Sequence, residues 1–357
     1  MQTISVILAG GNGTRFWPMS RTDLPKQVLN ISGNDVMINE TIKRCGDIIP
    51  EKDCYIVTAE NQVSVIDSVL LPEVPRDNIL AEPAARNTAP CILYAALKLR
   101  KIYGDGIMCV FPSDQYITDE DAFRRTLSTA VELAEKNEKL ITFGITPTFP
   151  STGYGYINFD RDDRTGDAYR VREFVEKPNL EKATEYINSG NYLWNSGIFV
   201  WKISTILRAF ERYLPHIYND LMKWDEYIGT PDERKVLAGI YPEVQKISID
   251  FGVMERSDDV LVIPADMGWN DVGSWDSLGA VFSPDEKGNI IRADNSVILD
   301  SDNCIIYSSK QLVSTVDIHD MIIVSTDDAL MVCPKSKAQS VKEIVEELAK
   351  RDMKKYI

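Results

Sequence analysis

The stretch Ile4–Gln27, ISVILAGGNGTRFWPMSRTDLPKQ, decides how the fold begins and what it binds. Its apolar run, residues 4–9, predicts a buried strand. Three glycines follow almost at once: Gly10, Gly11 and Gly13. Glycines let backbone N–H groups approach a ligand closely, because no Cβ is in the way and positive φ is allowed. Such a run of N–H groups suits a polyphosphate, and Arg15 and Lys26 add two cations.

This stretch matches neither of the common phosphate-binding loops. No lysine follows the glycines directly, so G-x-x-x-x-G-K-[ST] is absent. The motif G-x-G-x-x-G is absent too, because no glycine stands at its last position. A glycine pair after a strand could by itself be a tight turn. The combination of a strand, glycines, Thr-Arg and a downstream Pro-Lys nevertheless favours a nucleotide site.

Length and charge limit the classes of protein to which the chain can belong. Its 357 residues suffice for one large domain, or for a large and a small one, with a sizeable core. The net charge of −15 argues against nucleic acid or an anionic membrane as a partner. Neither a signal peptide nor a transmembrane stretch is recognisable. Six scattered cysteines without C-x-x-C predict reduced, buried thiols in a cytoplasmic protein.

The order of apolar and amphipathic segments predicts an α/β fold. Strands and helices alternate from the N-terminus to about residue 145, which indicates a mostly parallel, Rossmann-like sheet with helices on both faces. Residues 152–157 and 169–177 are expected to be extended. Beyond residue 284, short apolar runs separated by turn residues predict a small β domain, followed by a helix over 336–353. We therefore expect a catalytic domain over 1–284 and a small domain over 285–357.

Two aspartates have positions that suggest a specific role. Asp114 follows the strand expected over 106–111, and ligands of open α/β sheets lie beyond the carboxyl ends of the strands. Asp271 lies in Met267–Trp275, MGWNDVGSW, between two glycines and two tryptophans. A carboxylate at the end of such a strand suits Mg²⁺, so we favour the metal role for Asp114. Either aspartate could instead be a turn residue or a helix cap.

Further polar residues sit in otherwise apolar or extended segments. Glu176 and Lys177 could accept from sugar hydroxyls and neutralise a phosphate, or could form a surface ion pair. Asn195 needs a partner within its apolar strand, either a sugar hydroxyl or an internal hydrogen bond. Asn87 or Thr88 can cap the helix that follows them.

Several of these segments together resemble a known family. L-A-G-G-x-G-T-R followed by P-K, then F-V-E-K-P, W-N-S-G and W-x-D-V-G-S-W, occur here in the order typical of the sugar-1-phosphate nucleotidyltransferases. The segment EPAARNTAP, residues 82–90, is similar to the part of mannose-1-phosphate guanylyltransferases beside the nucleobase. Gln115 departs from the family, which usually has a histidine there. The resemblance also suggests that the small β domain is a short left-handed β-helix.

The resemblance implies which residues bind the nucleotide, which bind the sugar phosphate and which are catalytic. Those expected to hold the nucleotide are Leu8, Ala9, Gly10, Gly11, Gly13 and Thr14, with Glu82, Asn87 and Thr88 beside the guanine. Those expected to hold the sugar phosphate are Gly155, Glu176, Lys177 and Asn195. The expected catalytic residues are Arg15, Lys26, Asp114 and Asp271. In the family the second aspartate completes the metal site begun by the first, so Asp114 and Asp271 are expected to converge on Mg²⁺.

The reaction implied is transfer of GMP from GTP to mannose 1-phosphate, giving GDP-mannose and pyrophosphate, in a protein expected to be a homodimer. Two alternatives remain. One is the same reaction with another sugar or base, and the other is a sensor of nucleotide sugars without catalysis. The small domain contains no group of residues suited to catalysis, so its expected role is packing or self-association.

Overall fold

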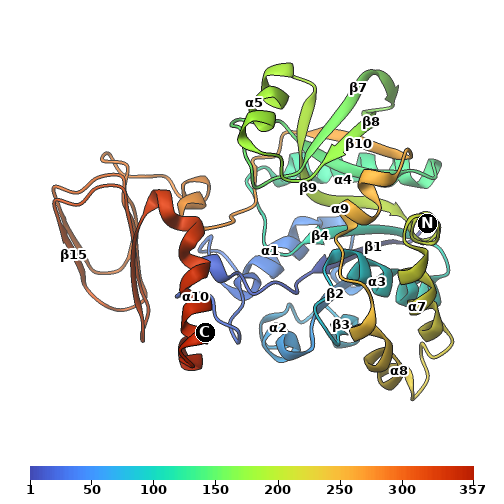
Figure 1. Cartoon of the computed structure of the whole chain (residues 1–357), viewed down its shortest axis with the longest axis horizontal. Helices are drawn as coiled ribbons and strands as arrows, with labels where there is room; N and C mark the ends of the chain where they lie inside the picture. Colours follow the sequence, from blue (N-terminus) through green and yellow to red (C-terminus); the bar gives the residue numbers. More distant parts are fainter.

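The computed structural model describes residues 1–357, and a nine-stranded sheet forms the centre of its large domain (Figure 1). The strands lie in the order β3-β2-β1-β4-β9-β6-β10-β8-β7. Seven of the nine point the same way, and β8 and β9 run against them. The expected mostly parallel sheet is therefore confirmed. The strand bounds are β1 Thr3–Leu8, β2 Cys54–Ala59, β3 Ile79–Glu82, β4 Ile107–Pro112, β6 Leu140–Ile145, β7 Tyr156–Thr165, β8 Ala168–Val175, β9 Tyr192–Lys202 and β10 Val260–Ala265.

Helices cover both faces of this sheet, as expected. Neighbouring strand residues such as Val6 and Ile7 are fully buried and belong to opposite faces, because strand side chains alternate. One face packs on α3 Thr88–Tyr103, α6 Ile203–Tyr213, α7 Pro215–Asp225, α8 Glu233–Ile240 and α9 Ile249–Gly252. The other packs on α1 Met37–Arg44, α2 Val63–Val69, α4 Glu120–Lys136 and α5 Leu180–Ser189.

A two-stranded ribbon at the edge of this domain positions the two aspartates. β5 (Tyr116–Ile117) pairs antiparallel with β11 (Trp269–Asn270), and Tyr116 lies opposite Asn270. Asp114 precedes this ribbon by two residues and Asp271 follows it by one. The pairing therefore brings two residues far apart in the sequence to the same end of the ribbon.

The C-terminal part coils into a short β-helix. Its strands are β12 Ile290–Ala293, β13 Ser296–Leu299, β14 Ile305–Ser308, β15 Val313–Val316, β16 Met321–Ser325 and β17 Leu330–Pro334. β12, β14 and β16 pair in parallel, as do β13 and β15, and β17 returns antiparallel to β16. Its own interior is small, and consists of Cys304, Ile306, Val313 and Ile323.

A second apolar cluster joins the small domain to the large one. Phe16 and Trp17, from the segment after the glycines, pack with Trp275, Ile322 and Val341. Helix α10 (Val341–Lys350) lies between the β-helix and the N-terminal segment (Figure 1). The indole Nε1 of Trp275 donates to the Trp17 carbonyl over 3.1 Å. The small domain thus shares its core with the stretch that begins the fold.

Two expected elements differ from those observed. Residues 152–155 are not part of a strand, and β7 begins only at Tyr156. The reason is a turn at Ser151, whose hydroxyl accepts from the Gly153 N–H and whose carbonyl accepts from the Tyr156 hydroxyl. The C-terminal helix is also shorter than expected, because a 3₁₀ segment, Lys335–Ser340, precedes α10.

The six cysteines are unpaired, and all but Cys333 are buried, in agreement with the expected burial. None of the helices combines the length and the apolar character that crossing a membrane would require.

Close packing at Gly144 gives a test of the sheet. Gly144 in β6 lies opposite Asn195 in β9, and a Cβ there would be 2.6 Å from Leu193 Cδ1 and 2.7 Å from Val262 Cγ2. Gly144→Ala should therefore lower the free energy of unfolding by about 1–3 kcal/mol. Gly239→Ala, in α8 with no atom within 4 Å of the new Cβ, should raise it by about 0.5–1 kcal/mol. Urea unfolding of both variants measures the difference, and equal stability of the two would contradict the packing described.

Candidate active site

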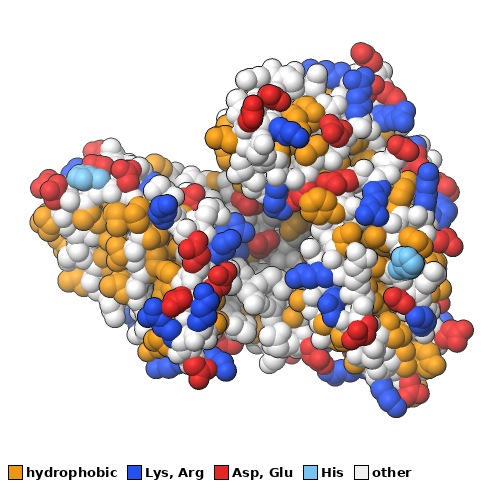
Figure 2. All heavy atoms as spheres, viewed as in Figure 1, with side chains coloured by type: hydrophobic (Ala, Val, Ile, Leu, Met, Phe, Trp, Pro, Cys, Tyr) orange, Lys and Arg blue, Asp and Glu red, His pale blue; other side chains and the backbone are white.

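A large hollow of the molecule lies between the lobe of β7, β8 and α5 and the lobe of α2, α3 and α8 (Figure 2). Its volume is about 630 Å³. Many of the residues expected to bind substrates line it: Leu8, Gly10, Gly11, Glu82, Asn87, Thr88, Gly155, Glu176, Lys177, Asn195 and Asp271. Ala9, Gly13, Thr14, Arg15, Lys26 and Asp114 are not part of the lining, and the contacts below place several of them beside it.

Side chains behind the glycine loop hold it in place, and Gly13 has a backbone conformation that favours glycine. The Ala9 carbonyl accepts from Gln27 Nε2 over 2.6 Å and from Thr58 Oγ1 over 3.0 Å. Gly13 has φ 64°, and a Cβ there would lie 2.3 Å from the Cβ of Lys26. Gly13 is therefore required by the passage of Lys26 beneath the loop as well as by its own conformation.

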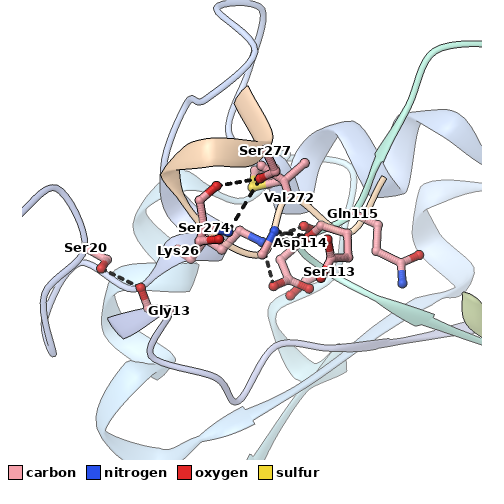
Figure 3. A network of polar contacts seen from close by, with 12 residues as sticks. Gly13, Ser20, Lys26, Ser113, Asp114, Gln115, Val272, Ser274 and Ser277 are labelled. Carbon is pink, nitrogen blue, oxygen red and sulfur yellow. Dashed lines mark hydrogen bonds and ion pairs between the residues drawn. The ribbon is translucent and has the colours of Figure 1, made fainter. Parts of the chain in front are cut away.

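Lys26 connects the two aspartates, and Figure 3 shows its side chain beside Asp114. Its Nζ donates to Asp114 Oδ2 over 2.9 Å, to the Asp114 carbonyl over 2.9 Å and to the Asp271 carbonyl over 3.1 Å. The side chain is buried, so the ammonium depends on these oxygens for its hydrogen bonds. The two aspartate segments, distant in sequence, therefore converge on one cation.

The donor atoms of the two aspartates suit a hard divalent cation. Asp114 Oδ2 is engaged by Lys26, whereas its Oδ1 makes no hydrogen bond with the protein. Asp271 Oδ1 accepts from the Tyr154 hydroxyl over 2.8 Å and from the Gly273 N–H over 3.2 Å, which leaves Oδ2 without a protein partner. Burial, with the charge of Asp271, raises the pKa of the Tyr154 hydroxyl, so it remains a donor. Each carboxylate thus keeps one oxygen for an ion such as Mg²⁺.

Glu82 is a nearly buried carboxylate at one end of the cavity. A Cβ on Gly10 would lie 3.4 Å from its Oε2, so this oxygen faces the glycine loop. The Tyr241 hydroxyl donates to its Oε1. Burial raises the pKa of Glu82 to about 7, although hydrogen bonds from Tyr241 and Cys91 oppose the shift. This carboxyl can therefore change its charge near neutral pH.

Asn87 and Thr88 cap α3 while they line the cavity. Asn87 has φ 67°, and its Oδ1 accepts from the Thr88 N–H over 2.8 Å. Thr88 Oγ1 accepts from the N–H of Ile249 over 2.9 Å. The capping role considered from the sequence is therefore present, and the Asn87 amide nitrogen and the Thr88 hydroxyl proton remain free of protein partners.

Gly155, Glu176, Lys177 and Asn195 meet at the other end of the cavity. The Gly155 carbonyl accepts from the Asn195 N–H over 2.8 Å, and a Cβ on Gly155 would lie 2.5 Å from Glu176 Oε2. Lys177 pairs with Glu176 and is far more exposed, with 60% against 9% of the side chain accessible. The Asn195 amide also makes internal hydrogen bonds, since it accepts from the Gly197 N–H and donates to Asp250.

Asp250 belongs to this end of the cavity and was not recognised in the sequence. Its Oδ1 accepts from Asn195 Nδ2 over 3.0 Å. Burial and the nearby Glu176 raise its pKa to about 6. The only sequence signal was a carboxylate inside the apolar run 247–254, after Ser248, which caps α9. Gln115, where a histidine was expected, donates to the Ser196 carbonyl and so ties the end of β4 to β9.

Comparison with known proteins agrees with this arrangement. A family model described as nucleotidyl transferase matches residues 4–288, and one described as a MannoseP isomerase/GMP-like beta-helix domain matches 285–348. A mannose-1-phosphate guanylyltransferase of Escherichia coli is 38% identical over 354 residues, 96% of this chain and 73% of that protein. The alginate biosynthesis protein AlgA of Pseudomonas aeruginosa is 36% identical over 97% of this chain and 72% of its own.

A solved structure shares both the fold and part of the sequence. It is described as a mannose-1-phosphate geranyltransferase from Thermus thermophilus and superposes with a TM-score of 0.87 at 34% identity. The alignment covers 98% of this chain and 100% of that chain. The chain belongs to the nucleotidyl transferase family, in the group whose members are named mannose-1-phosphate guanylyltransferases.

Proposed function

We propose that this protein transfers GMP from GTP to α-D-mannose 1-phosphate, with GDP-mannose and pyrophosphate as products. The observation that carries the proposal is the convergence of Asp114 and Asp271 on Lys26, beside a cavity with Glu82 at one end and Glu176 and Lys177 at the other. The names of the relatives, mannose-1-phosphate guanylyltransferases among them, support this choice of substrates.

The chemistry needs positioning and charge neutralisation more than proton transfer. The phosphate of a sugar 1-phosphate is largely dianionic at pH 7, since its second pKa is about 6. It can therefore attack the α-phosphorus of GTP in line, without a general base or a covalent intermediate. Lys177, the exposed cation at the sugar end, would orient that phosphate, while Glu176, Asn195 and the Gly155 backbone would hold the sugar.

At the nucleotide end, Leu8 and Ala9 lead into the loop of Gly10, Gly11, Gly13 and Thr14, which would receive the β- and γ-phosphates. Glu82 would accept from the N–H groups of guanine, with Asn87 and Thr88 beside it. Arg15 would stabilise charge on the leaving pyrophosphate. Lys26 is among the expected catalytic residues, and its ammonium is directed at Asp114 and Asp271, so we assign it the task of holding them.

A divalent cation completes the proposal. Asp114 and Asp271 would hold Mg²⁺ through the two oxygens that have no protein partner. When bound, the ion would neutralise phosphate charge and align the phosphates for displacement. An acidic chain has particular need of such local positive charge, since its overall field repels nucleotides.

The remaining features of the proposal concern setting and organisation. The unpaired cysteines favour the cytoplasm, and the negative charge favours neither nucleic acid nor membrane as partner. We propose a homodimer, with a catalytic domain over 1–284 and a small domain over 285–357. A sensor without catalysis is disfavoured because Arg15, Lys26, Asp114, Lys177 and Asp271 are all present.

Pyrophosphate release is the direct test of the reaction. With Mg²⁺ present, GTP, ATP, UTP and dTTP should each be combined with mannose 1-phosphate and glucose 1-phosphate. We expect release with GTP and mannose 1-phosphate only. Turnover with another pair would overturn the substrate assignment, and GDP-mannose binding without any release would indicate a sensor.

The same assay tests the metal-binding role of Asp114. Asp114→Ala should lower the rate by about 10²–10³, because an oriented charge on the reacting phosphates is lost, and EDTA should abolish release by the wild-type protein. Asp258→Ala, an exposed aspartate without contacts, is the matched control and should retain full activity. A fully active Asp114→Ala protein would remove Asp114 from the mechanism.

The raised pKa of Glu82 predicts a pH-dependent affinity for GTP. Only the ionised carboxylate can accept from two guanine donors, and its pKa is about 7, so GTP should bind more tightly as the pH rises from 6 to 8. Below the pKa, the dissociation constant should change by up to about tenfold per pH unit. Calorimetric titrations of the wild type and of Glu82→Gln at each pH separate this effect from titration of the nucleotide itself. Parallel profiles for the two proteins would exclude Glu82 as the titrating group.

A further inference from the structure

One side chain of the small domain reaches the catalytic segments. Gln339 lies in the 3₁₀ segment Lys335–Ser340 that links β17 to α10. Its Oε1 accepts from Arg15 Nη1 over 3.0 Å, and its Nε2 donates to Ser274 Oγ over 2.7 Å. A single amide therefore bridges the segments of Arg15 and Ser274, which lie far apart in the sequence.

Both partners of Gln339 belong to segments that carry the proposed chemistry. Arg15 follows the glycine loop, and Ser274 stands three residues after Asp271. The Ser274 side chain is buried and forms a capping box with Ser277 at the start of the 3₁₀ segment Trp275–Ala280. Figure 3 shows Ser274 and Ser277 beside Lys26 and Asp114. Ser274 is thus a buried anchor, from which Gln339 can hold an exposed partner.

Arg15 is that exposed partner. Its guanidinium is exposed, and its hydrogen bond to Gln339 is the only one that it makes with the protein. It lies against the loop of Asp271, because a Cβ on Gly273 would be 3.4 Å from Arg15 Nη1. Without Gln339, a long exposed side chain of this kind would sample many rotamers.

The chemical nature of Gln339 suits the task. A neutral amide oxygen can orient a guanidinium while leaving its charge available to phosphate, whereas a carboxylate would compete with phosphate for that charge. The position of the amide is itself fixed, because Ala338 and Val341 on either side are buried in the core shared by the two domains.

We propose that Gln339 is a positioning residue for nucleotidyl transfer. It holds Arg15 in the orientation required to receive the phosphates of the nucleotide, and through it the small domain takes part in catalysis as well as in packing. The inference rests on the proposed function in one respect, the role of Arg15 toward those phosphates.

A double-mutant cycle on the full-length chain tests the proposal. Gln339→Met keeps the size of the side chain and removes both hydrogen bonds. We expect a fall in kcat of about tenfold, since a small misplacement of a charged group weakens transition-state stabilisation, with the KM for mannose 1-phosphate unchanged. In an Arg15→Ala background, Gln339→Met should cause no further loss of kcat, because Gln339 acts on the reaction only through Arg15.

Two controls separate positioning from folding. Lys337→Ala alters an exposed neighbour in the same 3₁₀ segment whose side chain makes no hydrogen bond or ion pair, and should retain full activity. The thermal midpoint of Gln339→Met should match that of the wild type, because Gln339 is exposed. Full activity of Gln339→Met, or effects of the two substitutions that multiply, would overturn the proposal.

A binding measurement keeps this test independent of the reaction. Calorimetry with GTP should show the same non-additivity between Arg15→Ala and Gln339→Met, whichever sugar phosphate the protein uses. Failure of the wild type to release pyrophosphate with any pair would count against the proposed function alone. Additive effects on GTP affinity would count against the role of Gln339 alone.

Discussion

The buried ammonium of Lys26 is the interaction on which the rest of the site depends. A lysine has three N–H donors, and here three oxygens receive them, two from Asp114 and one from Asp271. A buried charge is tolerated only when it is paired and hydrogen-bonded in this way. The segments that follow β1, β4 and β11 are therefore tied to one atom. Gly13 is part of the same constraint, because only a residue without Cβ leaves room for Lys26.

This arrangement determines which positive charges remain for a nucleotide. The charge of Lys26 is directed at Asp114. Phosphate must therefore be received by other cations, among them Arg15, Lys177 and a bound metal ion, in a chain with a net charge of −15. Arg15 and Lys177 are both exposed, with few protein contacts. The site thus separates a buried part, which holds the aspartates, from exposed cations at its rim.

Much of the fold and of this site could be predicted, because it depends on apolar patterns and motifs within short stretches of sequence. The alternation of apolar runs and amphipathic segments specified strands such as β2 and helices such as α4, and the motifs specified Asp114 and Asp271. The β5–β11 ribbon could not be predicted, since two-residue strands carry no periodicity. Asp250 was missed because one carboxylate in an apolar run has no motif around it. The direction of the Lys26 ammonium depends on tertiary contacts that no local pattern encodes.

The small domain shows the same limit most clearly. Its apolar runs predicted strands, but not that Ile322 would pack with Phe16 and Trp17 from the beginning of the chain. Its own interior is too small to form a core alone, so its stability depends on that shared cluster. A domain that must pack against the glycine-loop segment inevitably fixes the position of that segment. Gln339 extends this coupling from packing to a polar contact, and no feature of the sequence around it distinguishes it from other surface glutamines.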